Sequence, residues 1–250
     1  MDRAEASRIA HGELRLWNPL NDAAVDESIE VLDLAPGARV LDVACGRAEV
    51  LRRVAERWPI ETTGYDSDAA LIDSGPSGLN LEVRDSPPPG PFDLVICIAS
   101  SHALGGWPDA LEGLRELTEP GGQVLLGEGY WRRPPSDEYV EALGGASADE
   151  LPDYSGLMHA AEEAGLTPLH SSVASETDWD GYEWRLILNA ERWAAENPGD
   201  SSGDVLLERA RSARERITMP GGRETSASRS RCCGASDWRA EPREARSRIA

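Results

Sequence analysis

Two apolar runs without a polar face constrain the fold of this chain more than any other feature of its sequence. They are VLDVA at residues 40–44 and FDLVICIA at residues 92–99. Each run has the length of a strand, and its hydrophobicity is continuous rather than alternating, which is typical of a strand buried on both faces. Such burial requires a layer of helices on each side of the sheet, so these runs predict an α/β fold.

Helix-spaced segments alternate with strand-like segments along the body of the chain. Apolar residues fall on one helical face over 50–58 and again over 110–117. The strand-like segments, each bounded by Gly, Pro or Asp, are residues 40–44, 60–65, 79–83, 92–98, 124–127 and 166–173. Strands joined by helical crossovers run parallel, so we predict a doubly wound, mostly parallel sheet with helical additions at both ends.

The same patterns divide the chain into four segments. We predict an N-terminal helical lid at 1–35, a ligand-binding α/β core at 36–175, a C-terminal helical segment at 176–216 and a disordered or aberrant tail at 217–250. The tail is rich in Gly, Ser, Arg and Ala and has no strand or helix period. We therefore interpret it as a frame-shifted or otherwise altered end, which reading the gene in its other two frames would test.

Charge restricts the classes of partner. The chain has a net charge of −20, and no lysine is present among its 25 basic residues. Residues 1–208 hold 14 Arg against 40 acidic residues, a net charge of −26, whereas residues 209–250 hold 11 Arg against 5 acidic residues, a net charge of +6. Nucleic acids and anionic membranes bind to positive potential, so we expect neither as a partner of the body of the protein.

We expect a cytoplasmic protein that acts on a small molecule. The first residues, MDRAEASR, contain no apolar signal segment, and no run approaches the length of a membrane helix. The four cysteines have no zinc-finger or CxxC spacing, and the histidines form no metal-ligand pattern with carboxylates, so no metal site is predicted. The oligomeric state stays open.

Chemistry-bearing residues follow the predicted strands directly. In an open parallel sheet the ligand lies at the carboxyl ends of the strands, where the strand order reverses. The residues found there are Asp42 and the turn 44–48 after the first strand, Asp66 after the second, Asp85 after the third, Ser100 and His102 after the fourth, and Glu128 at the fifth. The small residues of the turn let the backbone approach a ligand, and Asp66 is placed to accept hydrogen bonds from ribose hydroxyls.

Two cofactor classes share this geometry. Dinucleotide enzymes use GxGxxG to bring a helix N-terminus against a pyrophosphate, and the corresponding positions here are Ala44, Gly46 and Glu49. A glutamate against a doubly negative group disfavours NAD and suits a ligand with a cationic or zwitterionic end.

Four segments, taken in order, resemble the motifs of the class I S-adenosylmethionine-dependent methyltransferases. They are VLDVACGRAEVL, GYDSDAAL, FDLVICIASSHALGG and LTEPGGQVLLGE, which span residues 38–130. The flanking segments HGELRLWNPL and GEGYWRRPPSDEY resemble an actinobacterial-type small-molecule subgroup of that family. The resemblance implies a Rossmann-like methyltransferase fold, S-adenosylmethionine as the cofactor and a small-molecule methyl acceptor.

The resemblance also implies roles for individual residues. Asp42, with Ala44 and Gly46, would frame the amino-acid end of the methyl donor, and Asp66 would hold its ribose. The remaining donor-binding positions would be Ser67, Asp85, Ser86, Ser100 and Trp17, with Asp85 and Ser86 against the adenine.

The transfer step needs an aligned acceptor and, where the acceptor is protonated, a base. His102 is our first candidate for that base because it follows the fourth strand, and Glu128 is the second. A hydrogen bond that caps the loop is the structural alternative for His102, and an N-cap or an ion pair with Arg132 is the alternative for Glu128. Trp17, Trp107 and Trp131 are candidates to wall the acceptor pocket, although core packing is the more common role of tryptophan and Trp17 is the best lid candidate of the three. Arg132 and Arg133 are candidates to bind an acidic acceptor group.

Three features depart from the family pattern. The glycine-rich turn reads Ala44-Cys45-Gly46-Arg47-Ala48, the segment from Asp66 to Asp85 is short, and no strand-like run follows residue 217 to supply the seventh strand of this fold. We therefore keep two alternatives: a catalytically weak or inactive donor-binding module and, less favoured because GxGxxG is absent, an NAD-dependent oxidoreductase.

Overall fold

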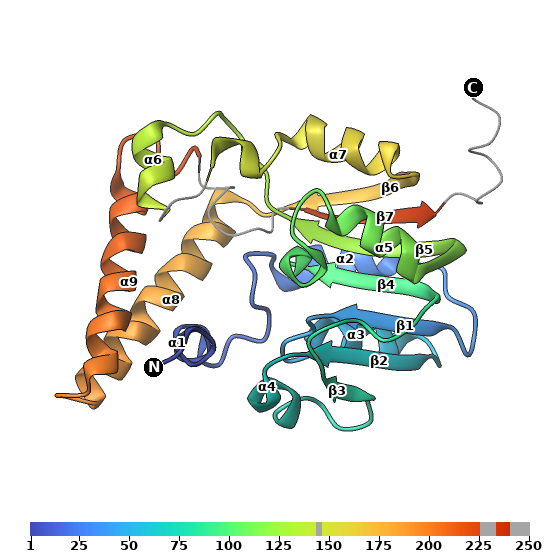
Figure 1. Ribbon diagram of the computed structural model, residues 1–250, viewed down its shortest axis with the longest axis horizontal. Helices are drawn as coiled ribbons and strands as arrows, with labels where there is room; N and C mark the ends of the chain where they lie inside the picture. The colour runs from blue at the N-terminus through green and yellow to red at the C-terminus, as the bar shows by residue number, and fades with distance from the viewer. Residues whose placement is uncertain (144–146, 226–233, 241–250) are drawn as a thin grey trace.

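A computed structural model describes residues 1–143, 147–225 and 234–240 of the 250-residue chain, and Figure 1 shows the arrangement of its elements. The strands are β1 (Arg39–Val43), β2 (Glu61–Asp66), β3 (Leu81–Val83), β4 (Phe92–Ile98), β5 (Thr118–Glu128), β6 (Leu166–Val173) and β7 (Gly234–Ala240). The helices are α1 (Arg3–His11), α2 (Asp22–Glu30), α3 (Glu49–Arg57), α4 (Ala69–Asp73), α5 (Ala110–Leu117), α6 (Asp137–Ala142), α7 (Tyr154–Glu163), α8 (Glu176–Glu196) and α9 (Ser201–Thr218), with short 3₁₀ helices η1 (Ser101–Leu104) and η2 (Ala148–Glu150).

The strands form a single seven-stranded sheet in the order β3-β2-β1-β4-β5-β7-β6. Strands β1 to β5 pair in parallel, and β7 runs antiparallel to both of its neighbours. The strand order reverses between β1 and β4, which is where a doubly wound sheet binds its ligand. The predicted fold class, a doubly wound and mostly parallel sheet, is confirmed.

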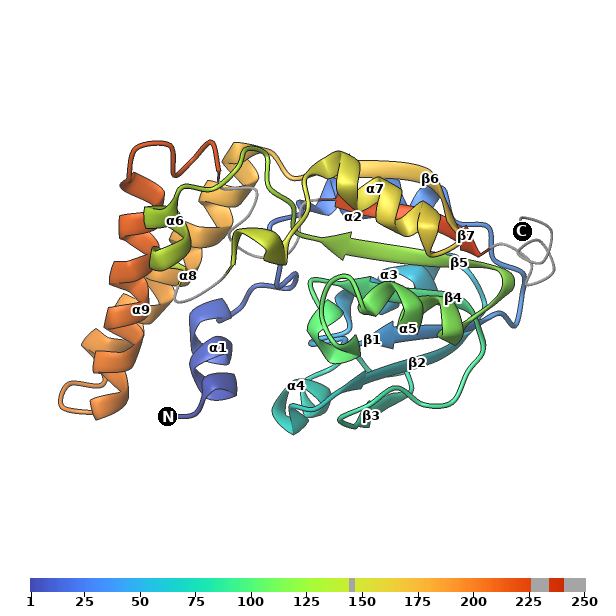
Figure 2. The ribbon, with the colours of Figure 1, turned by 45° about the horizontal axis from the view of Figure 1, so that its top comes forward.

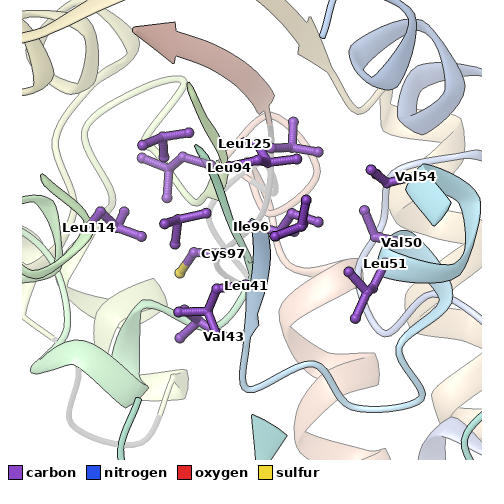
Figure 3. Close-up of a cluster of buried hydrophobic side chains, with 14 of the residues drawn as sticks. Leu41, Val43, Val50, Leu51, Val54, Leu94, Ile96, Cys97, Leu114 and Leu125 are labelled. Atoms are coloured by element: carbon purple, nitrogen blue, oxygen red, sulfur yellow. The ribbon is translucent and has the colours of Figure 1, made fainter. Parts of the chain in front are cut away.

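Helices cover both faces of the sheet, as the continuous hydrophobicity of the strands requires. Figures 1 and 2 show α5 and α7 on one face and α2 and α3 on the other. In the core, Val50, Leu51 and Val54 of α3 lie on one side of β1, and Leu114 of α5 lies on the opposite side (Figure 3). Leu41, Leu94 and Leu125 of the central strands are fully buried between these layers.

The structure corrects our expectation that the seventh strand is absent. Residues 234–240 form β7, which pairs with β5 from Gln123 opposite Arg239 to Glu128 opposite Gly234, and with β6 from Leu166 opposite Ala240 to Val173 opposite Gly234. The segment reads GASDWRA and has no apolar pattern, but a strand between two others is held through its backbone N–H and C=O groups. The rest of the predicted tail beyond residue 225 lies outside the described residues.

Helices α1, α6, α8 and α9 gather beyond the carboxyl ends of the parallel strands (Figures 1 and 2). Helices α8 and α9 pack along each other, and α1 packs on α8 through Ala6 and Ile9, which join Ile187 and Ala190 in a small separate core. The predicted lid segment 1–35 therefore consists of two parts with different positions. Helix α2 lies against the sheet and α3, whereas α1 packs on α8. Within the described part of the chain, no helix has both the length and the apolar character needed to cross a membrane.

Candidate functional site

The turn after β1 is built from left-handed backbone conformations. Ala44, Gly46 and Ala48 have φ values of 46°, 55° and 54°. The turn is closed by the Cys45 N–H, which donates to the Tyr65 carbonyl over 2.8 Å, and by the Ala48 N–H, which donates to the Cys45 carbonyl over 2.8 Å. No atom lies within 4 Å of the position that a Cβ on Gly46 would take, so the backbone at the middle of the turn faces open space.

Asp66 joins this turn to the end of β2. One oxygen of its carboxylate accepts the Gly46 N–H over 2.9 Å, and the other accepts the Asp68 N–H over 2.9 Å. The two predicted donor-binding positions, Gly46 and Asp66, are therefore brought together, and the Asp66 carboxylate is oriented by backbone donors before any ligand arrives.

Asp42 lies beneath the turn and is only 5% exposed. Burial, and then the negative charge of nearby Asp66, raise the pKa of Asp42 to about 8, against a smaller opposing effect of a hydrogen bond with the Leu51 backbone. The carboxyl group of Asp42 is thus mostly protonated at neutral pH.

The predicted catalytic residues follow β4 and β5, which are neighbours in the sheet. Ala99 donates its N–H to the Gly127 carbonyl over 2.9 Å, and this contact holds the two strand ends together. Ser100 is buried and donates its hydroxyl to the Cys97 sulfur over 3.3 Å, whereas His102 lies on η1 and is exposed. Glu128 is 1% exposed and accepts the Gly129 N–H over 2.8 Å.

Three further predicted donor-binding positions lie near one edge of the sheet. Ser67, Asp85 and Ser86 are exposed, near the edge strand β3. Arg84 connects this region to Asp66, because its N–H donates to the Asp66 carbonyl over 2.9 Å while its Nε donates to the Ser86 carbonyl over 3.2 Å.

The N-terminal segment contacts two of these loops. Arg8 of α1 forms an ion pair with Asp68, the residue that caps α4 and follows Asp66 closely in sequence. Arg47 of the turn donates from Nη2 to the Gly12 carbonyl, at the end of α1, over 2.8 Å. Helix α1 is therefore held against the carboxyl edge of the sheet by contacts with both donor-binding loops, a position that Figures 1 and 2 show between α8 and α4.

Trp17 belongs to an aromatic cluster that sequence reasoning missed. The ring of His11 stacks on Trp17 with centroids 4.1 Å apart, and His11 Nε2 lies 2.8 Å from the hydroxyl of Tyr182 on α8. Burial, and to a smaller extent the charge of Arg47, lower the pKa of His11 to about 4, against the opposing effect of a hydrogen bond with the Ser7 carbonyl. No local signal could have joined His11 to Tyr182, because 171 positions separate them.

Several expected acceptor contacts are corrected by the structure. Trp131 is 6% exposed and packs with Tyr139 and Leu151 while donating to the Ala148 carbonyl, so it is a core residue rather than a pocket wall. Trp107 is half-buried against the main core. Arg132 donates to the Ala174 carbonyl over 2.9 Å and pairs with Glu176, and the exposed Arg133 pairs with Glu224.

The electrostatic argument drawn from Glu49 is also corrected. Glu49 is bonded to Arg52 and Arg53 at 2.8 and 2.9 Å, and these hydrogen bonds lower its pKa to about 2 against the effect of burial. Its charge is compensated within α3, so it does not act as a free carboxylate at the turn.

A cavity of 610 Å³ lies between α1 and α8, away from the residues that follow the strands. Its lining residues include Gly12, Leu14, Arg185, Asn189 and Trp193. Among the described residues, no group of three or more His, Cys, Asp or Glu side chains is arranged to hold a metal ion.

The chain is similar to methyltransferases in sequence and in fold. The methyltransferase domain family matches residues 12–171. The YjhP protein of Escherichia coli is 27% identical over 213 residues, or 80% of this chain and 86% of YjhP. The X-ray structure of YjhP has a TM-score of 0.82 at 25% identity and covers 96% of this chain and 100% of that one.

Two further proteins are similar to this chain, one in structure and one in sequence. The structure of a Geobacter sulfurreducens S-adenosylmethionine-dependent methyltransferase in complex with S-adenosylhomocysteine has a TM-score of 0.80 at 22% identity, covering 94% of this chain and 97% of that one. The trans-aconitate 2-methyltransferase of Streptomyces avermitilis is 31% identical over 102 residues, or 36% of this chain and 38% of that protein. The family match covers more than half of the chain, and the residues expected at the donor site meet at one edge of the sheet. The chain belongs to the class I S-adenosylmethionine-dependent methyltransferases.

Proposed function

We propose that the protein transfers a methyl group from S-adenosylmethionine to a small-molecule acceptor, as a member of the actinobacterial-type small-molecule subgroup. The observation that carries this proposal is the meeting of three loops at the switch point of the sheet: the turn 44–48, the end of β2 with Asp66, and the Ser100–His102 segment after β4. A ligand with a ribose, an adenine and an amino-acid end needs separate contacts for each of its parts, and three converging loops can supply them.

Polar groups of this chain fit the methyl donor. The buried polar atoms without a hydrogen-bond partner among the described residues include the hydroxyl of Tyr65 on β2 and Nε of Arg47 in the turn. Arg47 belongs to the turn, the backbone carbonyl of Tyr65 accepts the Cys45 N–H of the turn, and Gly46 faces open space. When bound, S-adenosylmethionine supplies an electrophilic methyl group on a sulfonium sulfur. Asp66 would accept hydrogen bonds from the ribose, and Asp42 with the turn would frame the amino-acid end.

The outer donor-binding positions complete this assignment. The exposed residues Ser67, Asp85 and Ser86 would line the ribose and adenine side, and Ser100 would border the site from β4. Trp17 would close it from the N-terminal segment, where the ring is held by His11 and by its own Nε1 donating to the Leu14 carbonyl over 3.1 Å.

The acceptor is a small molecule rather than a nucleic acid. Residues 1–208 carry a net charge of −26, which repels a polyanion. The trans-aconitate 2-methyltransferase relative is named for a small organic acid and supports an acceptor of that size.

His102 is the base or acceptor-orienting residue that we favour over Glu128. His102 is exposed on η1, directly after β4, and can reach a substrate from the open side of the sheet edge. Glu128 is buried at the end of β5, so its carboxyl group would influence only the groups next to it.

Ligand binding tests the donor assignment. Calorimetry with S-adenosylhomocysteine should give a dissociation constant in the micromolar range, and a ligand at a hundred times its dissociation constant should stabilise the protein by about 2.7 kcal/mol. Absence of binding would overturn the proposal, and stabilisation by NADH instead would favour an oxidoreductase. Donor binding without transfer of label from isotopically labelled donor in cell extract would favour the inactive binding module.

Replacing His102 tests catalysis apart from donor binding. We expect His102→Ala to lower kcat for the identified acceptor by about 10²-fold or more while the dissociation constant for S-adenosylhomocysteine stays within twofold. The matched control is His159→Ala, because His159 is exposed on α7 and pairs only with Glu163 among the contacts found in the described chain. Equal kcat in the two variants would remove His102 from the mechanism and direct attention to Glu128.

A further inference from the structure

Arg47 is a half-buried cation in the donor-binding turn, and its guanidinium group is only partly used. Nη2 donates to the Gly12 carbonyl over 2.8 Å. Nε is buried and has no acceptor among the described residues, and no carboxylate in that part of the chain forms an ion pair with Arg47. The side chain is thus fixed in place by one contact while another donor remains unsatisfied.

Arg47 differs in this respect from the arginines that follow it on α3. Residues 1–208 contain 40 acidic residues for 14 arginines, and the nearby Arg52 and Arg53 are both bonded to Glu49. A buried N–H without an acceptor is destabilising, and a guanidinium group matches a carboxylate through two parallel hydrogen bonds. Arg47 is therefore suited to bind an anion, and no carboxylate of the described residues fills that role.

The position of Arg47 identifies the anion. Asp66 lies on one side of the turn and is the expected ribose ligand. Gly46, between Asp66 and Arg47, faces open space. The amino-acid end of a donor whose ribose lies at Asp66 would reach the turn itself, at the start of α3. That end carries a carboxylate, which the free N–H groups at a helix N-terminus also favour.

We infer that Arg47 binds the α-carboxylate of the methyl donor and, through Gly12, couples occupancy of the donor site to the position of helix α1. This inference rests on the proposed function. The end of α1 is also held by Asn189 of α8, whose Nδ2 donates to the Ala10 carbonyl over 2.9 Å and would lie 2.8 Å from a Cβ on Gly12. The end of α1 therefore sits between Arg47 and α8, and a carboxylate that orients the guanidinium group also holds this junction.

Two ligands separate the carboxylate contact from the rest of the donor. S-Adenosylhomocysteine carries the amino-acid end, and 5′-methylthioadenosine shares its adenosine and sulfur but lacks that end. In calorimetry, Arg47→Ala should weaken binding of S-adenosylhomocysteine by about ten- to a hundredfold, as expected for a lost charge-assisted hydrogen bond, and change binding of 5′-methylthioadenosine by less than twofold. Arg47→Lys, which keeps the positive charge, should recover part of the loss.

The matched control is Arg115→Ala on α5, where the half-buried Arg115 forms no ion pair among the described residues and should leave both affinities unchanged. Equal weakening of both ligands by Arg47→Ala would overturn the inference, because Arg47 would then act only through the shape of the turn. An unchanged affinity for S-adenosylhomocysteine would also overturn it. Failure of the wild-type protein to bind either ligand would instead contradict the proposed donor site.

Hydrogen exchange tests the coupling to α1. S-Adenosylhomocysteine should slow amide exchange within residues 3–12 of the wild-type protein, and 5′-methylthioadenosine should slow it much less. In Arg47→Ala at saturating S-adenosylhomocysteine, the protection of α1 should be lost. Protection that persists in this variant would overturn the coupling through Arg47.

Discussion

At the scale of the residue, the turn 44–48 carries conformational strain because alanine occupies two of its left-handed positions. Ala44 and Ala48 stand where the family pattern has glycine, and both keep the left-handed conformation, at φ values of 46° and 54°. A Cβ in this region costs roughly 1–2 kcal/mol per residue. The methyl groups therefore do not reshape the turn but reduce the stability of the protein.

Restoring glycine should relieve this strain. We expect Ala44→Gly to raise the free energy of unfolding by about 1 kcal/mol in chemical denaturation. The control is Ala164→Gly at the end of α7, where φ is −72° and glycine should destabilise the protein by about 0.5–1 kcal/mol. Destabilisation by both substitutions would contradict the strain argument.

Asp42 makes the stability of the protein depend on pH. Its pKa rises from 3.8 to about 8 on folding, so the folded state binds the proton more tightly, and the stability that this group contributes falls as the pH rises through that window. His11 has the opposite effect, because its pKa falls from 6.5 to about 4 and the unfolded state takes up the proton first. Of these two groups, Asp42 is the one that acts between pH 6.5 and 8.

The free energy of unfolding of the ligand-free protein should therefore decrease between pH 6.5 and 8, by at most about 1.4 kcal/mol per pH unit for one proton. Asp42→Asn should make the profile flat in this range, whereas His11→Gln should leave the slope unchanged there and alter it only below pH 6.5. Urea titrations at several pH values measure both. A slope that persists in Asp42→Asn would assign it to another group.

At the scale of the element, α1 lies outside the sheet but contacts the loops after β1 and β2. It has a small apolar face toward α8, and its other contacts are polar ones with the loops after β1 and β2. The ion pair of Arg8 with Asp68 is partly buried, with side-chain exposures of 32% and 13%, so solvent screens it less than a surface pair.

Removing this ion pair should loosen α1. We expect Arg8→Ala to increase the opening of α1 by about 1 kcal/mol, seen as roughly fivefold faster amide exchange over residues 3–11. Arg3→Ala is the control, because Arg3 is exposed on the same helix and has no ion pair among the described residues. Equal exchange rates in the two variants would show that the apolar contacts with α8 alone hold the helix.

At the scale of the whole molecule, β7 completes the sheet. It is the strand between β5 and β6, so β6 is attached to the rest of the sheet through it. Helix α7 packs on β6, and α2 contacts both β6 and β7. Strand β7, which lies in a segment predicted as an irregular tail, therefore supports β6, α7 and α2.

Truncation should show this dependence. Ending the chain at residue 225 removes the backbone hydrogen bonds of two strand pairings, each bond contributing about 0.5–1.5 kcal/mol, which together rival the 5–15 kcal/mol stability of a typical domain. We expect this variant to lose its cooperative thermal transition, and a chain that ends at residue 240 to keep it. Cooperative unfolding of the shorter chain near the wild-type midpoint would mean that β7 is dispensable.

The strongly patterned elements could be predicted from the sequence, and the weakly patterned ones could not. Strands β4 and β6 coincide with the predicted residues 92–98 and 166–173, because apolar side chains mark them. Strand β5 begins at Thr118, whereas the prediction begins at residue 124, because the segment TEPGGQ pairs through its backbone without an apolar pattern. Strand β7 was missed for the same reason.

The donor-binding residues show the same division. Gly46 and Asp66 were predicted together because each directly follows a strand, and parallel strands end at a common edge. Arg47, His11 and Tyr182 were not predicted as a group, since their roles depend on α1 and α8 meeting at that edge.

The sequence by itself determined the doubly wound sheet and the residues at its carboxyl edge, because hydrophobic periodicity and strand ends are local properties of the chain. Only the tertiary structure decided which strand completes the sheet, that Nε of Arg47 is buried without an acceptor among the described residues, and which helix contacts the loops after β1 and β2. Those features depend on backbone pairing, on burial and on contacts between residues far apart in the chain, none of which leaves a local pattern.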